Sequence, residues 1–213
     1  ITVDSQYTLD FDDALSIRDM GDYIELGVHI ADVNYFIRRD DPIDREAIAR
    51  GSSIYMPDQK IPMLPQRLAE DLCSLRAGEL RPAISTLIRL NREAALLDYE
   101  IMPSVIRVAH QLSYFDVNMM ADGNPDIILL HDIARKYRQQ RLTDGAVQIT
   151  LPELNIWLGD DGVPVVSRTN RESPGRLLVS EIMIMANALM ARFLAEKGKI
   201  GRASCRERVC HRV

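Results

Sequence analysis

Cysteine and histidine are scarce in this sequence, and basic residues do not outnumber acidic ones. Of three cysteines among 213 residues, only Cys73 lies in the body of the chain, because the other two fall within residues 200–213. A disulfide-stabilised scaffold is therefore not supported, and a lone cysteine in the body is typical of a protein from a reducing cytoplasm. The four histidines are widely separated, which argues against a zinc site with the usual ligand spacing.

Long apolar runs and several common motifs are also missing. Polar residues interrupt the apolar stretches before the ~20 residues needed to cross a bilayer, so no transmembrane helix is expected. The first residues show no signal peptide, and the chain has no glycine-rich phosphate loop or nucleophile elbow. With 46% hydrophobic and 27% charged residues, the composition is that of a globular protein with a sizeable core.

The charge is distributed unevenly along the chain. Residues 200–213 contain four arginines and one glutamate, so the net charge of −5 becomes −8 for residues 1–199. The tail has no helical or strand period, and it could be a basic, RNA-attracting extension. Residues 200–209 also match one reading frame of a common sequencing-library adapter. We therefore expect residues 1–199 to be native and residues 200–213 to be a non-native tail, which sequencing the locus past codon 199 would test.

Hydrophobic periodicity predicts an α+β domain in which a mixed or antiparallel sheet packs against helices. Strands are expected at 14–18, 23–31, 84–90 and 98–108, and a further hairpin at 154–166. Helices are expected at 42–50, 66–75, from 113, at 125–142 and at 174–198. Asp41 can cap the first of these, Pro42 fits its first position and Gly51 can end it. The helix at 125–142 should bury Ile128, Leu129, Ile133, Ala134 and Tyr137. No internal repeat or domain boundary is visible.

Four carboxylates fall within residues 4–13, and apolar residues frame them. These are Asp4, Asp10, Asp12 and Asp13. Like charges close to a folded core repel and raise each other's pKa unless a cation intervenes, and carboxylate oxygens suit Mg²⁺. An EF-hand fits poorly, because Leu15 stands where its loop needs glycine. The residues alone leave two interpretations open, a divalent-cation site and a solvated acidic turn.

Two further segments carry weaker signals. Tyr55, on a proline-punctuated loop over residues 54–65, could stack on a nucleic-acid base or pack on the loop's own prolines. Arg76 and Arg81 could hold phosphates or pair with neighbouring acids. Cys73, next to Leu72, is expected in the core rather than as a nucleophile.

Taken together, these strings resemble the catalytic (RNB) domain of the ribonuclease II family of 3'-to-5' exoribonucleases. The matching strings are residues 1–5, 10–15, 29–33, 55–57, 61–65, 72–76 with 81–82, and 180–183 with 186–187. The resemblance covers about residues 1–199, as the N-terminal part of the catalytic domain. It implies a Mg²⁺-dependent hydrolase that acts on single-stranded RNA and releases nucleoside 5'-monophosphates from the 3' end.

The resemblance also implies a role for each acid of the cluster. Asp4 and Asp13 would be direct metal ligands. Asp12 would hold a second metal or orient the attacking water, and Asp10 would support the 3'-terminal nucleotide. Asp10 and Asp12 are therefore the implied catalytic residues, with Asp4, Asp12 and Asp13 as the implied metal ligands.

Four other residues are implied to contact RNA. Tyr55 would stack on the terminal base, Glu181 would approach the terminal nucleotide, and Tyr114 and Arg76 would contact the strand. The sequence departs from the family near residues 145–149, where members often carry an aromatic residue that stacks on the terminal base. This chain has Gln148 there.

The family's later segment with a catalytic arginine is absent, as are the flanking cold-shock and S1 RNA-binding domains. We expect these parts in the full-length protein, and we expect residues 1–199 alone to be inactive. The resemblance further implies a monomeric cytoplasmic enzyme with no membrane partner. Two alternatives remain, a catalytically silent RNA-binding relative and an unrelated metal phosphoesterase.

Overall fold

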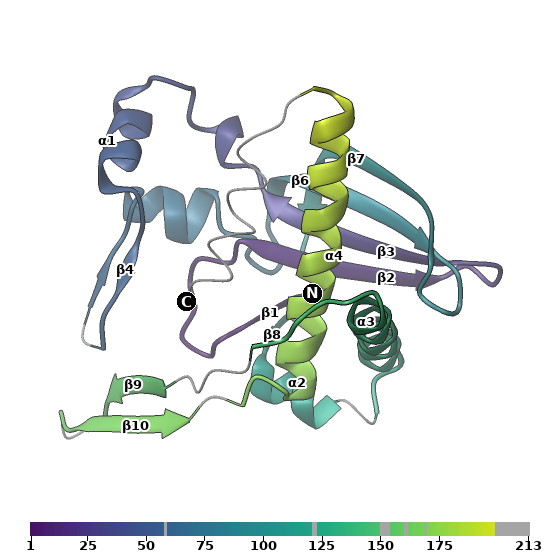
Figure 1. The fold of residues 1–213 in the computed structure, drawn as a ribbon. Coiled ribbons are helices and arrows are strands. Elements are labelled where there is room, and N and C mark those ends of the chain that lie inside the picture. The colour runs from purple at the N-terminus through teal and green to yellow at the C-terminus, as the bar shows by residue number, and fades with distance from the viewer. Residues whose placement is uncertain (58, 121–122, 150–153, 160–161, 169, 199–213) are drawn as a thin grey trace.

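The largest sheet among the described residues has four antiparallel strands in the order β2-β3-β6-β7, and it lies on the right in Figure 1. The computed structural model describes residues 1–57, 59–120, 123–149, 154–159, 162–168 and 170–198. The sheet's strands are Asp13–Asp19 (β2), Ile24–Ala31 (β3), Leu80–Leu90 (β6) and Leu96–Arg107 (β7). The predicted α+β class is confirmed. The expected non-native tail lies outside the described residues and stays a prediction.

The first hairpin forms where the alternating pattern predicts it. Ile24, Leu26 and Val28 of β3 are buried, and their alternation sets which face of the sheet meets the core. Gly21, with φ of 87°, allows the turn between β2 and β3. The second hairpin turns at Asn91, whose side-chain oxygen accepts hydrogen bonds from two backbone N–H groups of the turn.

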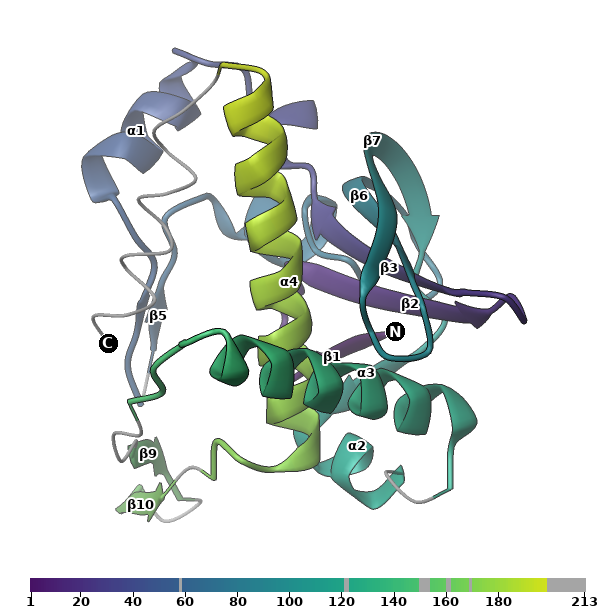
Figure 2. The same cartoon turned by 45° about the vertical axis from the view of Figure 1, so that its right-hand side comes forward.

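Helices cover the core face of this sheet (Figure 2). Helix α3 (Pro125–Thr143) packs against β2 and α4 (Pro174–Glu196), while α4 also contacts β3 and α2 (Tyr114–Met120). Although no membrane span was expected, α4 is long and apolar enough to cross one by length and composition alone. In this fold Leu178 and Ile182 of α4 are fully buried in the core that the sheet and helices share.

The helices form close to where they are predicted, with three corrections of detail. In α3 the predicted stripe is largely confirmed, because Ile133 and Ala134 are buried and Leu129 and Tyr137 pack partly buried against the core. Ile128 is wrong, since it is exposed, and Ile127 and Leu130 are buried instead. Helix α1 (Pro42–Arg50) begins after Asp41 as expected, but the Asp41 carboxylate accepts from the Arg38 backbone N–H rather than capping the helix. The helix expected over 66–75 ends sooner, in a wide turn at Leu68–Leu72.

Short strand pairs complete the architecture. Strand β1 (Thr2–Asp4) runs parallel to β8 (Gln111–Ser113), β4 (Ile54–Tyr55) pairs with β5 (Lys60–Ile61), and β9 (Leu154–Leu158) pairs with β10 (Pro164–Arg168). Helix α1 and the β4–β5 hairpin lie on the opposite side of α4 from the sheet (Figures 1 and 2). A 3₁₀ turn, Val33–Tyr35, follows β3. The β1–β8 pair was not predicted, because distant parallel segments leave no local signal.

The outer face of the sheet carries a row of hydrogen-bonded side chains across all four strands. His29 lies within it, with Nδ1 2.6 Å from Ser85 Oγ and Nε2 3.0 Å from Ser16 Oγ. Ser85 Oγ lies 2.6 Å from Ser104 Oγ. Burial lowers the pKa of His29 to about 4, so its imidazole is neutral near pH 7. The row is a fixed polar network on a half-buried surface.

We expect Gly27→Ala to lower the free energy of unfolding by about 1–2 kcal/mol. The added Cβ would lie 2.3 Å from Ser16 Oγ and 2.8 Å from His29 Nε2, so the serine hydroxyl must turn away from the histidine. Chemical denaturation measures the loss. In a Ser16→Ala background the glycine substitution should cost markedly less, and an equal cost in both backgrounds would contradict this explanation.

Candidate active site

The four aspartates lie on two strands and the loop that joins them. Asp4 ends β1, Asp13 begins β2, and Asp10 and Asp12 belong to the loop. The partner strand β8 holds β1 in register, and Ala31 N donates to the Asp12 carbonyl oxygen at 2.9 Å. The chain therefore returns on itself and brings the carboxylates within electrostatic reach of one another.

The fold disfavours the charged forms of Asp4 and Asp13. Burial, followed by the charges of Asp13, Asp12 and Asp10, raises the pKa of Asp4 to about 7. Burial and the charge of Asp12 raise the pKa of Asp13 to about 6. Asp4 Oδ2 is also buried with no hydrogen-bond partner. Mutually repelling carboxylates with an unpartnered buried oxygen form an arrangement that a hard cation would stabilise.

Asp10 is neutralised by the protein itself. Its Oδ2 accepts from the Lys60 ammonium at 2.7 Å and from the Tyr55 hydroxyl at 2.8 Å. Burial acts to raise the pKa of Asp10, but these two hydrogen bonds, a backbone hydrogen bond and the charge of Lys60 together hold that pKa below its usual value. Asp10 is thus anchored to the β4–β5 hairpin.

The remaining acids fit Mg²⁺ by the chemistry of their donors. Asp4, Asp12 and Asp13 offer carboxylate oxygens, which hard divalent cations prefer. Within the described part of the chain, however, no three His, Cys, Asp or Glu side chains gather into a ready-made metal site. The acids therefore interact through their charges without forming a closed ligand cage.

Tyr55 and Lys60 come from the two strands of one hairpin. The Tyr55 side chain is 66% exposed, with Lys60 Nζ 5.2 Å from its ring centroid. Burial of the hydroxyl and its hydrogen bond to Asp10 raise the pKa of Tyr55 to about 12, so the phenol stays protonated and donates. Tyr55 therefore presents an aromatic surface beside the acids rather than packing away on the loop prolines. Lys60 was not identified from the sequence, because its partner Asp10 is distant along the chain.

Tyr114 follows β8 directly and lies near the acidic cluster. Burial and then the charge of Asp4 raise its pKa. The Arg176 guanidinium lies 4.4 Å from the centroid of its ring. Ser113 and Asp116 fix the start of α2 by reciprocal hydrogen bonds, which orients Tyr114. The structure thus places Tyr114 near Asp4, and its contact with RNA stays a prediction.

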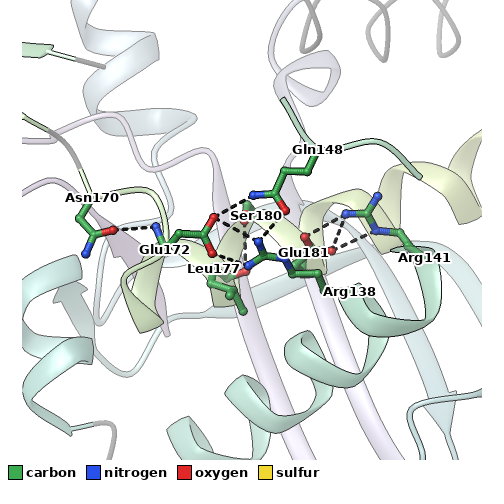
Figure 3. Close-up of polar contacts among 8 residues, drawn as sticks. All are labelled: Arg138, Arg141, Gln148, Asn170, Glu172, Leu177, Ser180 and Glu181. Atoms are coloured by element: carbon green, nitrogen blue, oxygen red, sulfur yellow. Dashed lines mark hydrogen bonds and ion pairs between the residues drawn. The ribbon is translucent and has the colours of Figure 1, made fainter. Parts of the chain in front are cut away.

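Glu181 lies on α4 and forms an ion pair with Arg141 (Figure 3). It is 6% exposed, and Arg141 Nη2 of α3 lies 2.9 Å from each of its carboxylate oxygens. Beside this pair, Arg138 binds Glu172 at 2.6 Å and also contacts Gln148 (Figure 3). Gln148, at the place where the family often has an aromatic ring, thus belongs to a polar cluster. These arginines were not identified, because α3 gives no sequence signal for their partners.

Arg76 lines a pocket of about 400 Å³ beside the acidic loop. The lining residues are Leu9, Gln66, Arg67, Glu70, Asp71 and Arg76. Its two acids are engaged by cations outside the lining, Glu70 by Lys60 and Asp71 by Arg81. Of the two alternatives for Arg81, the structure shows pairing with a neighbouring acid, Asp71. The predicted burial of Cys73 is confirmed.

A family model of the RNB domain matches residues 1–203. The chain belongs to the RNB-domain family. Among RNB-domain relatives, ribonuclease R from Chlamydia trachomatis is 34% identical over 205 residues, which is 92% of this chain and 29% of that protein. DIS3-like exonuclease 2 from Caenorhabditis elegans is 34% identical over 224 residues, 92% of this chain and 26% of that protein. The chain thus spans less than a third of these relatives, and the predicted family is confirmed.

Solved structures show the same RNB fold. RNase R from Mycoplasma genitalium, in complex with double-stranded RNA, superposes with a TM-score of 0.86 at 24% identity, over 93% of this chain and 37% of that chain. Yeast Ssd1, described as a pseudonuclease, has a TM-score of 0.75 at 23% identity, over 93% and 25% of the two chains. At these identities the likeness shows the fold alone, so the function must be argued from the residues of the site.

Proposed function

We propose that this chain is part of the catalytic domain of a hydrolytic 3'-to-5' exoribonuclease. It would act on single-stranded RNA and release nucleoside 5'-monophosphates. The observation that carries the proposal is the cluster of Asp4, Asp12 and Asp13 within an RNB fold, with raised pKa values at Asp4 and Asp13. An unrelated metal phosphoesterase is disfavoured, because the family match covers the whole acidic loop and the segments around it.

In this proposal the acids hold the metal, and Tyr55 binds the terminal base. Asp4, Asp12 and Asp13 would hold Mg²⁺, which supplies an activated water and neutralises charge at the phosphate. Asp10 orients the Tyr55 hydroxyl and so presents the exposed ring to the terminal base. A base stacked on such a ring gains about 1–3 kcal/mol, whatever its sequence.

A catalytically silent RNA-binding protein is the second candidate, since a pseudonuclease shares the fold. The intact acidic cluster favours the enzyme. Carboxylates without a bound cation repel RNA phosphates, and the buried Asp4 oxygen costs stability without contributing to binding. A protein selected only for RNA binding would gain by losing these acids.

The partners of the full-length protein follow from the charge of the chain. Residues 1–199 carry a net charge of −8, whereas RNA binding needs cations along the strand. We propose that flanking cold-shock and S1 domains supply much of this charge, in a monomeric cytoplasmic enzyme.

The test uses the full-length protein with a linear RNA labelled in its 3'-terminal nucleotide and an internally labelled circular RNA of the same sequence, with and without Mg²⁺. We expect Mg²⁺-dependent release of nucleoside 5'-monophosphates from the linear RNA, and no cleavage of the circular RNA, because it has no 3' end. Oligonucleotide products or a cut circle would contradict an exonuclease. RNA binding without any cleavage would favour the silent relative.

Arg76→Ala should weaken RNA binding several-fold and reduce the salt dependence of log Kd by about one counterion, with kcat unchanged. Arg76 faces the pocket beside the acidic loop, where a phosphate of the strand can reach it. Fluorescence anisotropy over a salt series measures both effects. Arg18→Ala, an exposed arginine on β2, is the matched control and should leave the salt slope unchanged. Equal slopes for Arg76→Ala and the parent would contradict the assignment.

A further inference from the structure

A single buried hydroxyl holds the backbone on both sides of Asp10. Ser74 is 1% exposed, and its Oγ donates to the Leu9 carbonyl oxygen at 2.8 Å and accepts from Phe11 N at 3.0 Å. Its two hydrogen bonds therefore reach the residues immediately before and after Asp10. The neighbouring Leu75 N donates to the Phe11 carbonyl oxygen at 2.9 Å, which extends the contact along the loop.

Arg81 of β6 in turn fixes the segment that carries Ser74. Its Nε donates to the carbonyl oxygens of Asp71 and Ser74 at 3.2 and 3.1 Å, and Nη2 pairs with the Asp71 carboxylate at 2.9 Å. The Arg81 side chain is only 14% exposed. A planar guanidinium can satisfy these acceptors in one geometry, which a lysine ammonium cannot reproduce. Ser74 is thereby anchored to the four-stranded sheet.

The hydrogen bonds from Ser74 and Leu75 oppose the repulsion among the carboxylates of the acidic loop, which acts to push its residues apart. Asp4, Asp12 and Asp13 repel one another, as close like charges do. Within the loop, Thr8 N donates to the Ser5 carbonyl oxygen, a contact that makes only a local turn. The hydrogen bonds from Ser74 and Leu75 instead tie the loop to the sheet side of the molecule.

We infer that Ser74 is a positioning residue, which fixes the peptide groups around Asp10 and thereby sets where Asp10 and Asp12 stand relative to Asp4 and Asp13. The inference rests on the proposed function. Ser74 acts through the loop, because its buried hydroxyl has both hydrogen bonds within the protein. Its loss should therefore change the rate of the chemical step more than the affinity for RNA.

The test compares Ser74→Ala with Ser85→Ala in the full-length protein. Ser85 is a matched control, since it is 3% exposed and its hydroxyl also makes two hydrogen bonds, to His29 and Ser104 on the outer face of the sheet. We expect Ser74→Ala to lower kcat at least about tenfold, because misplacing a reacting group by ~1 Å can cost about a hundredfold. Its KM and RNA Kd should stay within about twofold of the parent. Ser85→Ala should keep the parental kcat, whatever its loss in Tm.

The outcomes separate the inference from the proposed function. An active parent with equal kcat for the two serine variants would overturn the positioning role alone. So would a Ser74→Ala protein that loses RNA affinity but not kcat. A parent that releases no mononucleotides would overturn the proposed function, and this inference with it.

Arg81→Lys gives a second measurement, which holds even where Ser74→Ala does not fold. Arg81→Lys keeps the positive charge and leaves Ser74 unchanged. It removes the guanidinium group, whose hydrogen bonds to Asp71 and Ser74 hold this segment in place. We expect the same pattern of lowered kcat with retained RNA binding. A parental kcat in Arg81→Lys would overturn the inference that this anchoring sets the acidic loop.

Discussion

Asp12→Asn should lower the rate of mononucleotide release by at least about a thousandfold in the full-length protein, which is ~4 kcal/mol of barrier. The charge of Asp12 contributes to the raised pKa of both Asp4 and Asp13, so its carboxylate lies within electrostatic reach of the other two implied metal ligands. Removing one charged donor from such a set weakens cation binding and the activation of water. RNA affinity should stay within about threefold, because no RNA-contacting cation or aromatic ring is removed.

Single-turnover kinetics on linear RNA, with anisotropy for binding, measures the two effects separately. Asp22→Asn is the matched control, because it removes the same charge from the exposed β2–β3 turn. It should retain the parental rate. Equal activity of Asp12→Asn and the parent would exclude Asp12 from the chemistry.

Asp4→Asn should abolish activity while stabilising the metal-free protein above pH 7. An ordinary aspartate titrates near 3.9 when unfolded, whereas burial and neighbouring carboxylates raise the folded pKa of Asp4 to about 7. The folded state therefore holds a proton that the unfolded state has released between about pH 4 and pH 7. The contribution of Asp4 to stability is fully present below about pH 4 and is lost as the pH rises through 7.

The amide of Asp4→Asn cannot ionise, so its stability should lack this pH dependence. After allowance for solvent screening of a half-buried carboxyl, we expect a gain of about 1–2 kcal/mol at pH 8 without metal. Calorimetry in EDTA between pH 5 and pH 8 measures it as a Tm difference that grows with pH.

Adding Mg²⁺ should make the parent more stable than Asp4→Asn. The cation binds the folded parent and raises its Tm, while the variant that lacks the Asp4 carboxylate should respond weakly. An Asp4→Asn protein that is less stable than the parent at pH 8 in EDTA would contradict the repulsion. An equal Mg²⁺ response in both proteins would exclude Asp4 as a ligand.

Local sequence signals were sufficient for most of the fold. The β2–β3 hairpin was predictable because alternation and a turn glycine act within a few residues. Helix α1 was predictable because Pro42 fits its first turn and Gly51, with φ of 75°, ends it. The Asp41 side chain was misassigned because a backbone N–H just before the helix competes for the same carboxylate. In α3 the helical pattern placed Ile133 and Ala134 correctly in the core, and only Ile128 was misplaced.

The acidic cluster was visible for a similar reason, since its four members are close in sequence. The ion pairs of the site could not be predicted, because they join segments that are distant in the sequence. Lys60 neutralises Asp10 from the β4–β5 hairpin, and Arg141 of α3 covers Glu181 of α4. The resemblance to a family gave Glu181 a role, but it did not give the ion pair that now holds it.

The parallel pairing of β1 with β8 has a consequence for the cell that makes the protein. During synthesis all four aspartates exist once Asp13 is added, but Ser113, which pairs with Asp4, emerges much later. At ~5–20 residues per second the ribosome needs several seconds to bridge that interval. Until then the nascent chain carries the acids without the strand that orders Asp4. Asp4 can therefore take its place beside the other acids only after β8 has been synthesised.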